Sequence, residues 1–221
     1  MQATLYSAPD LPVTRHAPMA RNIEIKARIE SVEALVPKAA ALANEGPIEI
    51  VQDDTFFRCD TGRLKLRAFS RNSGELIFYR RANQLGPKES FYVRSPTSAP
   101  ETLRESLSLA YGQVGRVRKH RTLFFVGRAR IHLDRVERLG HFLELEVVLA
   151  DGEPSEGGVR EARELMDKLG VQPAQLIEGA YVDLLAQQDV QPLHRADMPG
   201  QAGSCRSRRT LSHNNNLGAK K

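Results

Sequence analysis

The segment RNIEIKARIES, residues 21–31, decides the fold that this sequence predicts, because its apolar and charged residues alternate one by one. Three isoleucines and an alanine fall on one side, and the other side consists of Glu24, Lys26, Arg28 and Glu30. Alternation with a period of two is typical of a β-strand that buries one of its faces. The charged face then points either to solvent or to a ligand, and the rest of the chain bears on that choice.

Segments with the same alternation follow along most of the chain and are separated by turn residues. The predicted strands are 21–29, 48–59, 62–69, 74–82, 88–95, 112–126, 127–136 and 140–150. Gly62, Gly74, Gly127 and Gly140 lie at the joints, as hairpin turns require. Eight mostly antiparallel strands in largely sequential order predict a sheet that closes on itself into a barrel.

Four segments have the apolar spacing or the end signals of helices instead. The predicted helices are 31–46, 98–112, 155–170 and 173–188. Because an apolar helix stripe needs a partner surface, we expect these helices to pack on the outside of the barrel. The predicted fold class is therefore α+β, a closed eight-stranded antiparallel barrel with helices around it.

The basic character of the chain belongs to its C-terminal end. Lys and Arg number 32 against 27 Asp and Glu, which gives a net charge of +5. Residues 195–221 contain six basic residues and one acidic residue, which equals that surplus. Residues 189–221 have few large apolar side chains, and residues 1–18 look equally unstructured. We expect a disordered N-terminal extension (1–18), a folded domain (19–188) and a disordered basic tail (189–221).

Several classes of protein are disfavoured by what the sequence lacks. No apolar run is long enough to cross a bilayer, and the N-terminus has no signal-like apolar stretch. The two cysteines, Cys59 and Cys205, form no disulfide framework or metal-binding spacing. No nucleotide-binding P-loop, dinucleotide-binding glycine motif or HExxH zinc motif is present. These observations predict a cytoplasmic protein with no membrane contact.

The charged faces of the strands are dominated by arginine and lysine. In phase with the first strand's polar face are eight cations: Lys26, Arg28, Lys65, Arg67, Arg81, Lys119, Arg121 and Arg130. Four acids share these faces: Glu24, Asp134, Glu144 and Glu146. For a single strand, a charged face is typical of a sheet surface that points to solvent. The recurrence on six strands, and the need of the helices for an apolar sheet face, favour a charged barrel interior.

An interior with a surplus of positive charge requires compensation, because unpaired buried ions cost several kcal/mol each. A polyanionic ligand supplies it, and the acids suit a hard divalent cation bound together with phosphate oxygens. Among the six histidines only His132 falls on this face, and we expect it to form a structural hydrogen bond rather than to act as a base.

Seven motifs in this chain resemble those of the CYTH family, the triphosphate tunnel metalloenzymes. They are NIEIK (22–26), QDDTFF (52–57), GRLKLR (62–67), LIFYRR (76–81), VRKHRTLFF (117–125), RIHLDRVERLGHFLELEVVL (130–149) and GAYVDLL (179–185). The family includes class IV adenylyl cyclases, thiamine triphosphatases and inorganic triphosphatases. NIEIK corresponds to the family's E-x-E-x-K signature, and Asn22 replaces its first glutamate.

The resemblance implies a barrel whose interior holds a triphosphate with Mg²⁺ or Mn²⁺. Carried over to this sequence, the metal ligands are Glu24, Glu144, Glu146 and Asp134. The eight cations named above become phosphate contacts, with Lys26, Arg67 and Lys119 in catalytic roles. Because Asn22 brings no negative charge, the binding of a second metal ion is in question.

The predicted activity is that of a class IV adenylyl cyclase, which converts ATP into cAMP and pyrophosphate. Two alternatives stay open: a triphosphatase acting on thiamine triphosphate, a nucleoside triphosphate or tripolyphosphate, and a non-catalytic binder of polyphosphate or nucleotides. The expected partner is a small triphosphate rather than nucleic acid, because a closed tunnel offers no platform for stacking successive bases. Whether the chain forms a homodimer stays open.

Overall fold

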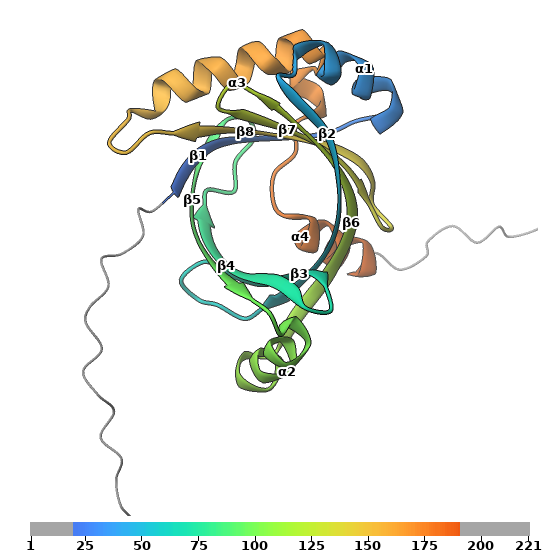
Figure 1. Ribbon diagram of the computed structural model, residues 1–221, viewed down its shortest axis with the longest axis vertical. Coiled ribbons are helices and arrows are strands. Elements are labelled where there is room, and N and C mark those ends of the chain that lie inside the picture. Colours follow the sequence, from blue (N-terminus) through green and yellow to red (C-terminus); the bar gives the residue numbers. More distant parts are fainter. Residues whose placement is uncertain (1–19, 191–221) are drawn as a thin grey trace, which may run out of the picture. The chain divides into compact units, whose positions relative to one another are not determined.

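The computed structural model describes residues 20–190 and is shown in Figure 1. The predicted N-terminal extension and basic tail lie outside the described residues, apart from the start of the tail at 189 and 190. The strands are β1 (Ala20–Arg28), β2 (Glu45–Phe57), β3 (Arg63–Ser70), β4 (Ser73–Arg81), β5 (Lys88–Thr97), β6 (Gln113–Val126), β7 (Ala129–Val136) and β8 (Gly140–Leu149). All eight predicted strands are thus confirmed, with shifted ends.

The helices are α1 (Val32–Leu42), α2 (Pro100–Tyr111), α3 (Ser155–Leu169) and α4 (Tyr181–Val190), with a short 3₁₀ helix η1 at Pro173–Gln175. Within the described part of the chain, none of them has the length and apolar character needed to span a membrane.

The strands form one antiparallel sheet that closes into a barrel. Their hydrogen-bonded order is β1-β5-β4-β3-β2-β6-β7-β8, and β8 pairs again with β1. Figure 1 looks through the resulting ring. Residues that lie directly opposite each other on paired strands point to the same face of the sheet. The β1–β8 register sets Glu24 opposite Glu146 and Lys26 opposite Glu144, so all four charges face the interior together.

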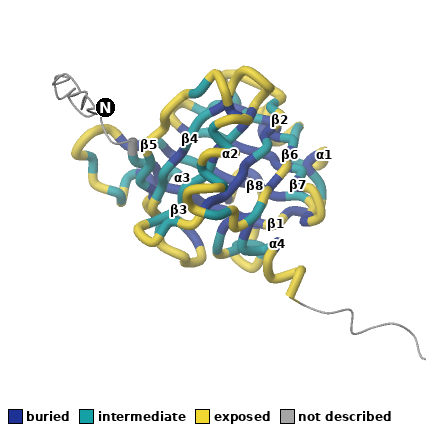
Figure 2. The backbone as a smooth tube through the Cα atoms, turned by 90° about the horizontal axis from the view of Figure 1, so that it is seen from below, coloured by how far each residue is buried: buried dark blue, intermediate teal, exposed yellow. Residues whose placement is uncertain are grey.

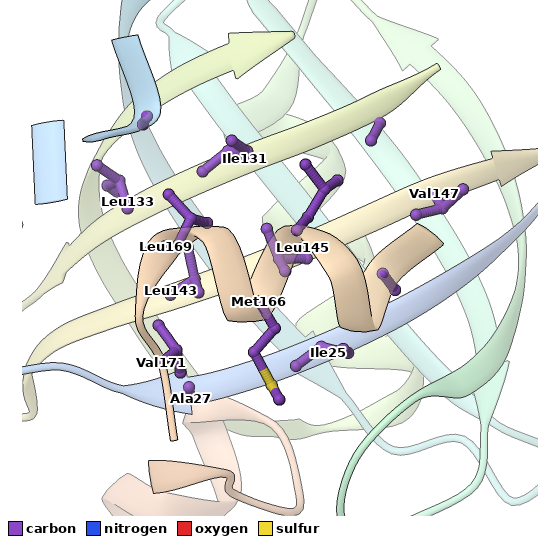
Figure 3. Packing of buried hydrophobic residues seen from close by; sticks show 14 of the residues in the cluster. Ile25, Ala27, Ile131, Leu133, Leu143, Leu145, Val147, Met166, Leu169 and Val171 are labelled. Atoms are coloured by element: carbon purple, nitrogen blue, oxygen red, sulfur yellow. The ribbon is translucent and has the colours of Figure 1, made fainter. Parts of the chain in front are cut away.

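The hydrophobic core lies on the outer face of the barrel wall, beneath α1 and α3. Ile25 of β1, Ile131 of β7 and Leu145 of β8 are fully buried there, against Met166 and Leu169 of α3 (Figure 3). Each fully buried aliphatic side chain of this kind stabilises the fold by about 1.5–3 kcal/mol. The prediction that the apolar face lies outside under helices is confirmed for this half of the barrel.

Gly158 allows α3 to approach the sheet this closely. A Cβ atom at this position would lie 2.7 Å from Leu149 Cδ2 and 2.8 Å from Ile23 Cγ1. Helix α2 covers the opposite part of the wall less completely, because only Pro100 of this helix is buried. Figure 2 shows buried and half-buried segments along the strands, with exposed segments concentrated in the turns.

The predicted helix at 173–188 is wrong in extent and in place. Leu176 forms a β-bridge with Ala27, and Ile177 N–H donates to the carbonyl oxygen of Lys26 at 3.0 Å. Gly179 has a left-handed φ of +75°, and only then does α4 begin. Helix α4 does not lie on the outer wall. Its first residues pack against the inward-facing Phe56 and Val117, and in Figure 1 the helix begins inside the outline of the ring.

Candidate functional site

The barrel encloses a cavity of about 380 Å³ whose wall carries most of the predicted site residues. Seven of the eight predicted cations line it: Lys26, Lys65, Arg67, Arg81, Lys119, Arg121 and Arg130. Glu24, Glu144 and Glu146 line it as well. The sequence pattern therefore identified which strand faces point inward, and the roles of these side chains in binding stay predictions.

Two predicted site residues are absent from this lining. Arg28 is exposed, and its Nη1 donates to the carbonyl oxygen of Leu139 at 2.7 Å. It is the last residue of β1, so the alternation runs on beyond the end of the cavity. Asp134 has no exposed surface and lies behind the cations that it binds. Neither residue lines the cavity, and the expectations that Arg28 contacts phosphate and that Asp134 binds metal stay predictions.

Asp134 instead holds two interior cations in place. Its carboxylate accepts from Lys119 Nζ at 2.9 Å and from Arg121 Nε and Nη2 at 2.6 and 2.7 Å. Burial opposes the ionisation of Asp134, but Arg121 and Lys119 outweigh it and hold the pKa of this carboxyl well below its usual value. Removing such a partner leaves buried charges uncompensated, which makes Asp134 a structural centre of the wall.

Tyr181, the first residue of α4, connects this helix to the same cluster. Its hydroxyl donates to Asp134 Oδ2 at 3.0 Å, and Lys26 Nζ lies 3.7 Å from the centre of its ring. Cations close to an aromatic face are attracted by the ring quadrupole. The motif GAYVDLL contains this tyrosine, yet its contact with Asp134 joins residues 47 positions apart and has no local signal.

Asp54 is a second anchoring carboxylate, and the sequence analysis did not identify it. It accepts from Lys65 Nζ at 2.8 Å and from Arg67 Nε and Nη2 at 2.7 and 2.8 Å. Burial, followed by repulsion from Arg67, lowers the pKa of Lys65 to about 7. The motif QDDTFF offered two adjacent aspartates, and only the strand phase decides which one faces inward.

Lys88 is a further interior cation that was missed. It lies opposite Glu24 in the β1–β5 register and is 2% exposed. Its Nζ donates to the carbonyl oxygen of Gln84 at 3.1 Å, and within residues 20–190 no carboxylate lies within ion-pair distance. Burial, followed by repulsion from Arg81, lowers its pKa to about 8. Lys88 and Ser90 lie on the same face of the strand, and this alternation is the sequence signal that could have identified Lys88 as an interior residue.

The remaining acids form a cluster that fits a divalent cation. Ligand atoms of His132, Glu144 and Glu146 all lie within 4.8 Å of one another. Glu24 faces Glu146 in the strand register but is ion-paired with Arg81 and lies outside this group. Carboxylate oxygens and an imidazole nitrogen are ordinary metal ligands. Burial and then Arg121 lower the pKa of His132, which favours the neutral imidazole that binds metal.

Four buried atoms of the cavity lining have no hydrogen-bond partner within the described part of the chain: Asn22 Oδ1, Gln52 Oε1, Arg81 Nε and His132 Nδ1. The expected structural hydrogen bond of His132 is therefore not made through Nδ1. Buried polar atoms are rarely left unpaired, so each one points to an ion, a water molecule or a ligand group. This observation and the donor set together support a cation at this position.

The cavity is polar at its centre and apolar at its borders. Beside α4, Phe56 and Val117 are buried. Elsewhere the apolar lining is more exposed, because Phe69 is 37% exposed and Tyr92 and Phe125 are half-buried. The opening is thus bordered by aromatic rings, which the sequence analysis did not anticipate.

Comparisons with known proteins agree with this architecture. The chain is 28% identical to the protein Adenylate cyclase CyaB of Aeromonas hydrophila over 174 residues, covering 75% of this chain and 88% of that protein. The structure of the PH1012 protein from Pyrococcus horikoshii OT3 superposes with a TM-score of 0.65 at 22% identity and covers 74% of this chain and 98% of its own. HpAC1 from Hippeastrum, a proposed adenylyl cyclase described as having a dominant triphosphatase activity, superposes with a TM-score of 0.56 at 14% identity, covering 80% and 100%.

At these identities the two solved structures support the fold alone. The family follows from a direct match to its sequence model, which extends over residues 20–181 and so includes all eight strands and the start of α4. The chain therefore belongs to the CYTH domain family.

Proposed function

We propose that this chain is a divalent-metal-dependent adenylyl cyclase of class IV that binds ATP in the barrel and releases cAMP and pyrophosphate. The observation that carries the proposal is the charge of the interior. Nine cations face it: Lys26, Lys65, Arg67, Arg81, Lys88, Arg94, Lys119, Arg121 and Arg130. Six carboxylates lie among or behind them: Glu24, Asp54, Glu75, Asp134, Glu144 and Glu146. A triphosphate is the common metabolite group that suits such a surplus.

The cations are held in fixed positions before any ligand arrives. Carboxylates shared between neighbours hold five of them, because Asp54, Asp134 and Glu144 each bind two cations and Arg121 is bound by both Asp134 and Glu144. The sequence analysis expected a surplus of positive charge that a ligand compensates, whereas carboxylates within residues 20–190 already pair almost all of these cations. Pre-organised charges stabilise a transition state without a reorganisation cost, and this effect is usually the largest in enzymes that act on phosphates.

Lys26, Arg67 and Lys119 are proposed to stabilise the charge that develops on the reacting phosphates. Lys26 Nζ is fixed by Glu144 Oε1 at 2.5 Å and by the ring of Tyr181. Arg67 forms a two-point contact with Asp54, and Lys119 is fixed by Asp134. Each therefore keeps its direction while one face of its charge remains available to a ligand in the cavity.

Glu146, Glu144 and Glu24 would hold the Mg²⁺ or Mn²⁺ ion. When bound, such an ion acts as a Lewis acid that neutralises phosphate charge. In the proposed reaction the ribose 3′-hydroxyl oxygen bonds to the α-phosphorus, the bond from that phosphorus to the bridging oxygen of the β-phosphate breaks, and pyrophosphate leaves as the hydroxyl proton is lost. The aromatic rings at the opening favour a substrate with an organic group over bare tripolyphosphate.

The second candidate is a triphosphatase, in which water attacks the terminal phosphorus instead. The same cations and the same metal position serve that reaction. The Hippeastrum protein, which has a similar fold, is described as having a dominant triphosphatase activity, and this supports the second candidate.

One incubation separates these functions. The purified full chain is mixed with ATP, thiamine triphosphate or tripolyphosphate, each with Mg²⁺ or Mn²⁺, and the products are identified by chromatography. Cyclic AMP and pyrophosphate from ATP are the expected result. ADP and phosphate would support the triphosphatase, and saturable binding of a triphosphate without turnover would indicate a non-catalytic binder. Neither binding nor turnover of any of the three would overturn the proposal.

A further inference from the structure

We propose that His132 binds the divalent cation directly through Nδ1, together with Glu146 and Glu144, and that this nitrogen ligand makes the site select a first-row transition-metal ion such as Mn²⁺ over Mg²⁺. The inference rests on the metal requirement of the proposed function, and it adds the identity of one ligand and of the preferred class of metal.

The first argument is the state of the His132 ring. The side chain lines the cavity and is 4% exposed, and its Nδ1 has no hydrogen-bond partner within residues 20–190. A buried polar atom left without a partner costs about 1–3 kcal/mol. A cation at Nδ1 removes that cost, because the unshared electron pair of a neutral imidazole binds metal directly.

The second argument is the distance from Nδ1 to the two carboxylates. Nδ1 lies 3.8 Å from Glu146 Oε1 and 3.9 Å from Glu144 Oε2. Both distances exceed hydrogen-bond length. For ligands at about 2.1 Å from an octahedral ion, neighbouring ligand atoms lie about 3.0 Å apart and opposite ones about 4.2 Å apart. The observed spacing falls between these values and leaves room for an ion between the three groups.

The third argument is that Glu146 has a free oxygen. Its Oε2 makes one long contact, 3.4 Å to Arg130 Nη1, and its Oε1 has no hydrogen bond in the described part of the chain. Glu144 is more committed, because Lys26 and Arg121 each contact one of its oxygens at 2.5 Å. Glu146 Oε1 and His132 Nδ1 are therefore two unengaged ligand atoms that face each other.

The backbone supports this geometry. His132 lies opposite Glu144 in the β7–β8 register, and Glu146 lies opposite both Arg130 of β7 and Glu24 of β1. All these side chains project from the wall of a closed sheet, which fixes their relative positions better than loops would.

The ligand types explain the selectivity. Mg²⁺ prefers an octahedron of oxygen atoms and keeps several water molecules, whereas sites that contain nitrogen bind the first-row transition metals, with affinity that rises from Mn²⁺ toward Cu²⁺. The nitrogen ligand therefore moves the preference of this site away from Mg²⁺.

The test uses the full-length chain without a tag and Mn²⁺ alone, with no nucleotide present. Electron spin-echo modulation of bound Mn²⁺ reports a directly coordinated ¹⁴N nucleus, and competition with Mg²⁺ gives the selectivity. The variant is His132→Gln. The matched control is His120→Gln, because His120 lies on the outer face with Nδ1 3.3 Å from Glu49 Oε2.

We expect a ¹⁴N signal in the parent and in His120→Gln, and none in His132→Gln. Even partners that only orient a ligand are worth about 10- to 100-fold in metal affinity, so Mn²⁺ affinity should fall by about tenfold or more while Mg²⁺ affinity changes far less. Absence of nitrogen coupling in the parent, its persistence in His132→Gln, or equal affinity of the parent for Mn²⁺ and Mg²⁺ would overturn the inference. The parent spectrum decides the question even if the variant does not fold. Mn²⁺ bound through His132 in a chain that neither binds nor turns over triphosphates would overturn the proposed function and not this inference.

Discussion

Asp134 and His132 lie two residues apart on the same face of β7, yet they belong to opposite kinds of environment. The Asp134 cluster (Asp134, Lys119, Arg121 and Tyr181) satisfies its carboxylate with four hydrogen bonds. The His132 cluster (His132, Glu144 and Glu146) leaves a ring nitrogen and a carboxylate oxygen unengaged. The comparison teaches that interior charges of a barrel divide into groups that hold the wall together and groups that remain available to a ligand.

The largest expected effect is on stability in the Asp134 cluster. Asp134→Ala leaves Lys119 and Arg121 buried without their main partner, and breaking a buried ion pair from one side costs roughly 3–5 kcal/mol. We expect that loss in the free energy of unfolding measured with chemical denaturant. The control is Asp151→Ala in the exposed turn after β8, which should change stability by less than about 0.5 kcal/mol. A similar small change in Asp134→Ala would show that the cluster does not hold the wall.

The His132 cluster should respond in the opposite way. Glu146→Gln removes the least engaged carboxylate, so turnover should fall by about 100-fold or more, which corresponds to about 2.7 kcal/mol of transition-state stabilisation. Its free energy of unfolding should change by less than about 1 kcal/mol. Steady-state kinetics at saturating metal and denaturant titration measure the two quantities, with Glu105→Gln on the exposed side of α2 as control. Parental turnover in Glu146→Gln would contradict the assignment of this cluster to the metal.

A smaller effect is expected on ligand affinity, from the protonation of Lys65, which is paired with Asp54. The pKa of Lys65 is lowered to about 7, so the free side chain is charged below pH 7 and largely neutral at pH 8. Bound phosphate favours the charged form of Lys65. At pH 8 the binding of phosphate should therefore be accompanied by proton uptake on Lys65, whereas at pH 6 Lys65 already carries this proton. The affinity for tripolyphosphate should therefore fall as pH rises above 7, by at most about tenfold per pH unit.

Calorimetry in buffers with different ionisation enthalpies measures that proton uptake. The comparison with Lys65→Met separates the contribution of Lys65 from those of the ligand and of Lys88, whose pKa is lowered to about 8. Equal proton uptake by the parent and by this variant at pH 8 would contradict the assignment.

Alternation along the chain was sufficient to predict the strands and the direction of their charged faces. It did not show where the cavity ends, so Arg28 was included although it lies past the interior. It also did not separate Asp54 from Asp53, because adjacent residues are distinguished only by the phase of the strand in the folded sheet. The prediction of a helix at 173–188 was wrong because Leu176 forms a β-bridge with Ala27. This is a tertiary contact, and the helical spacing of the segment does not reveal it. The unpaired state of His132 Nδ1 depends on three strands at once and has no local signature.

The central claim, that the barrel interior binds a triphosphate, is tested most directly by calorimetric titration of tripolyphosphate into the full chain at fixed ionic strength. The account predicts saturable binding of about one ligand per chain, because the cations converge on one cavity inside the barrel. Arg67→Gln, which keeps a donor for Asp54 but removes an interior charge, should weaken binding by about tenfold. Arg118→Gln on the outer face, where Arg118 makes only long contacts of 3.6 and 3.9 Å to carboxylates, should leave binding unchanged. Absence of saturable binding, or equal weakening by the two variants, would contradict the account.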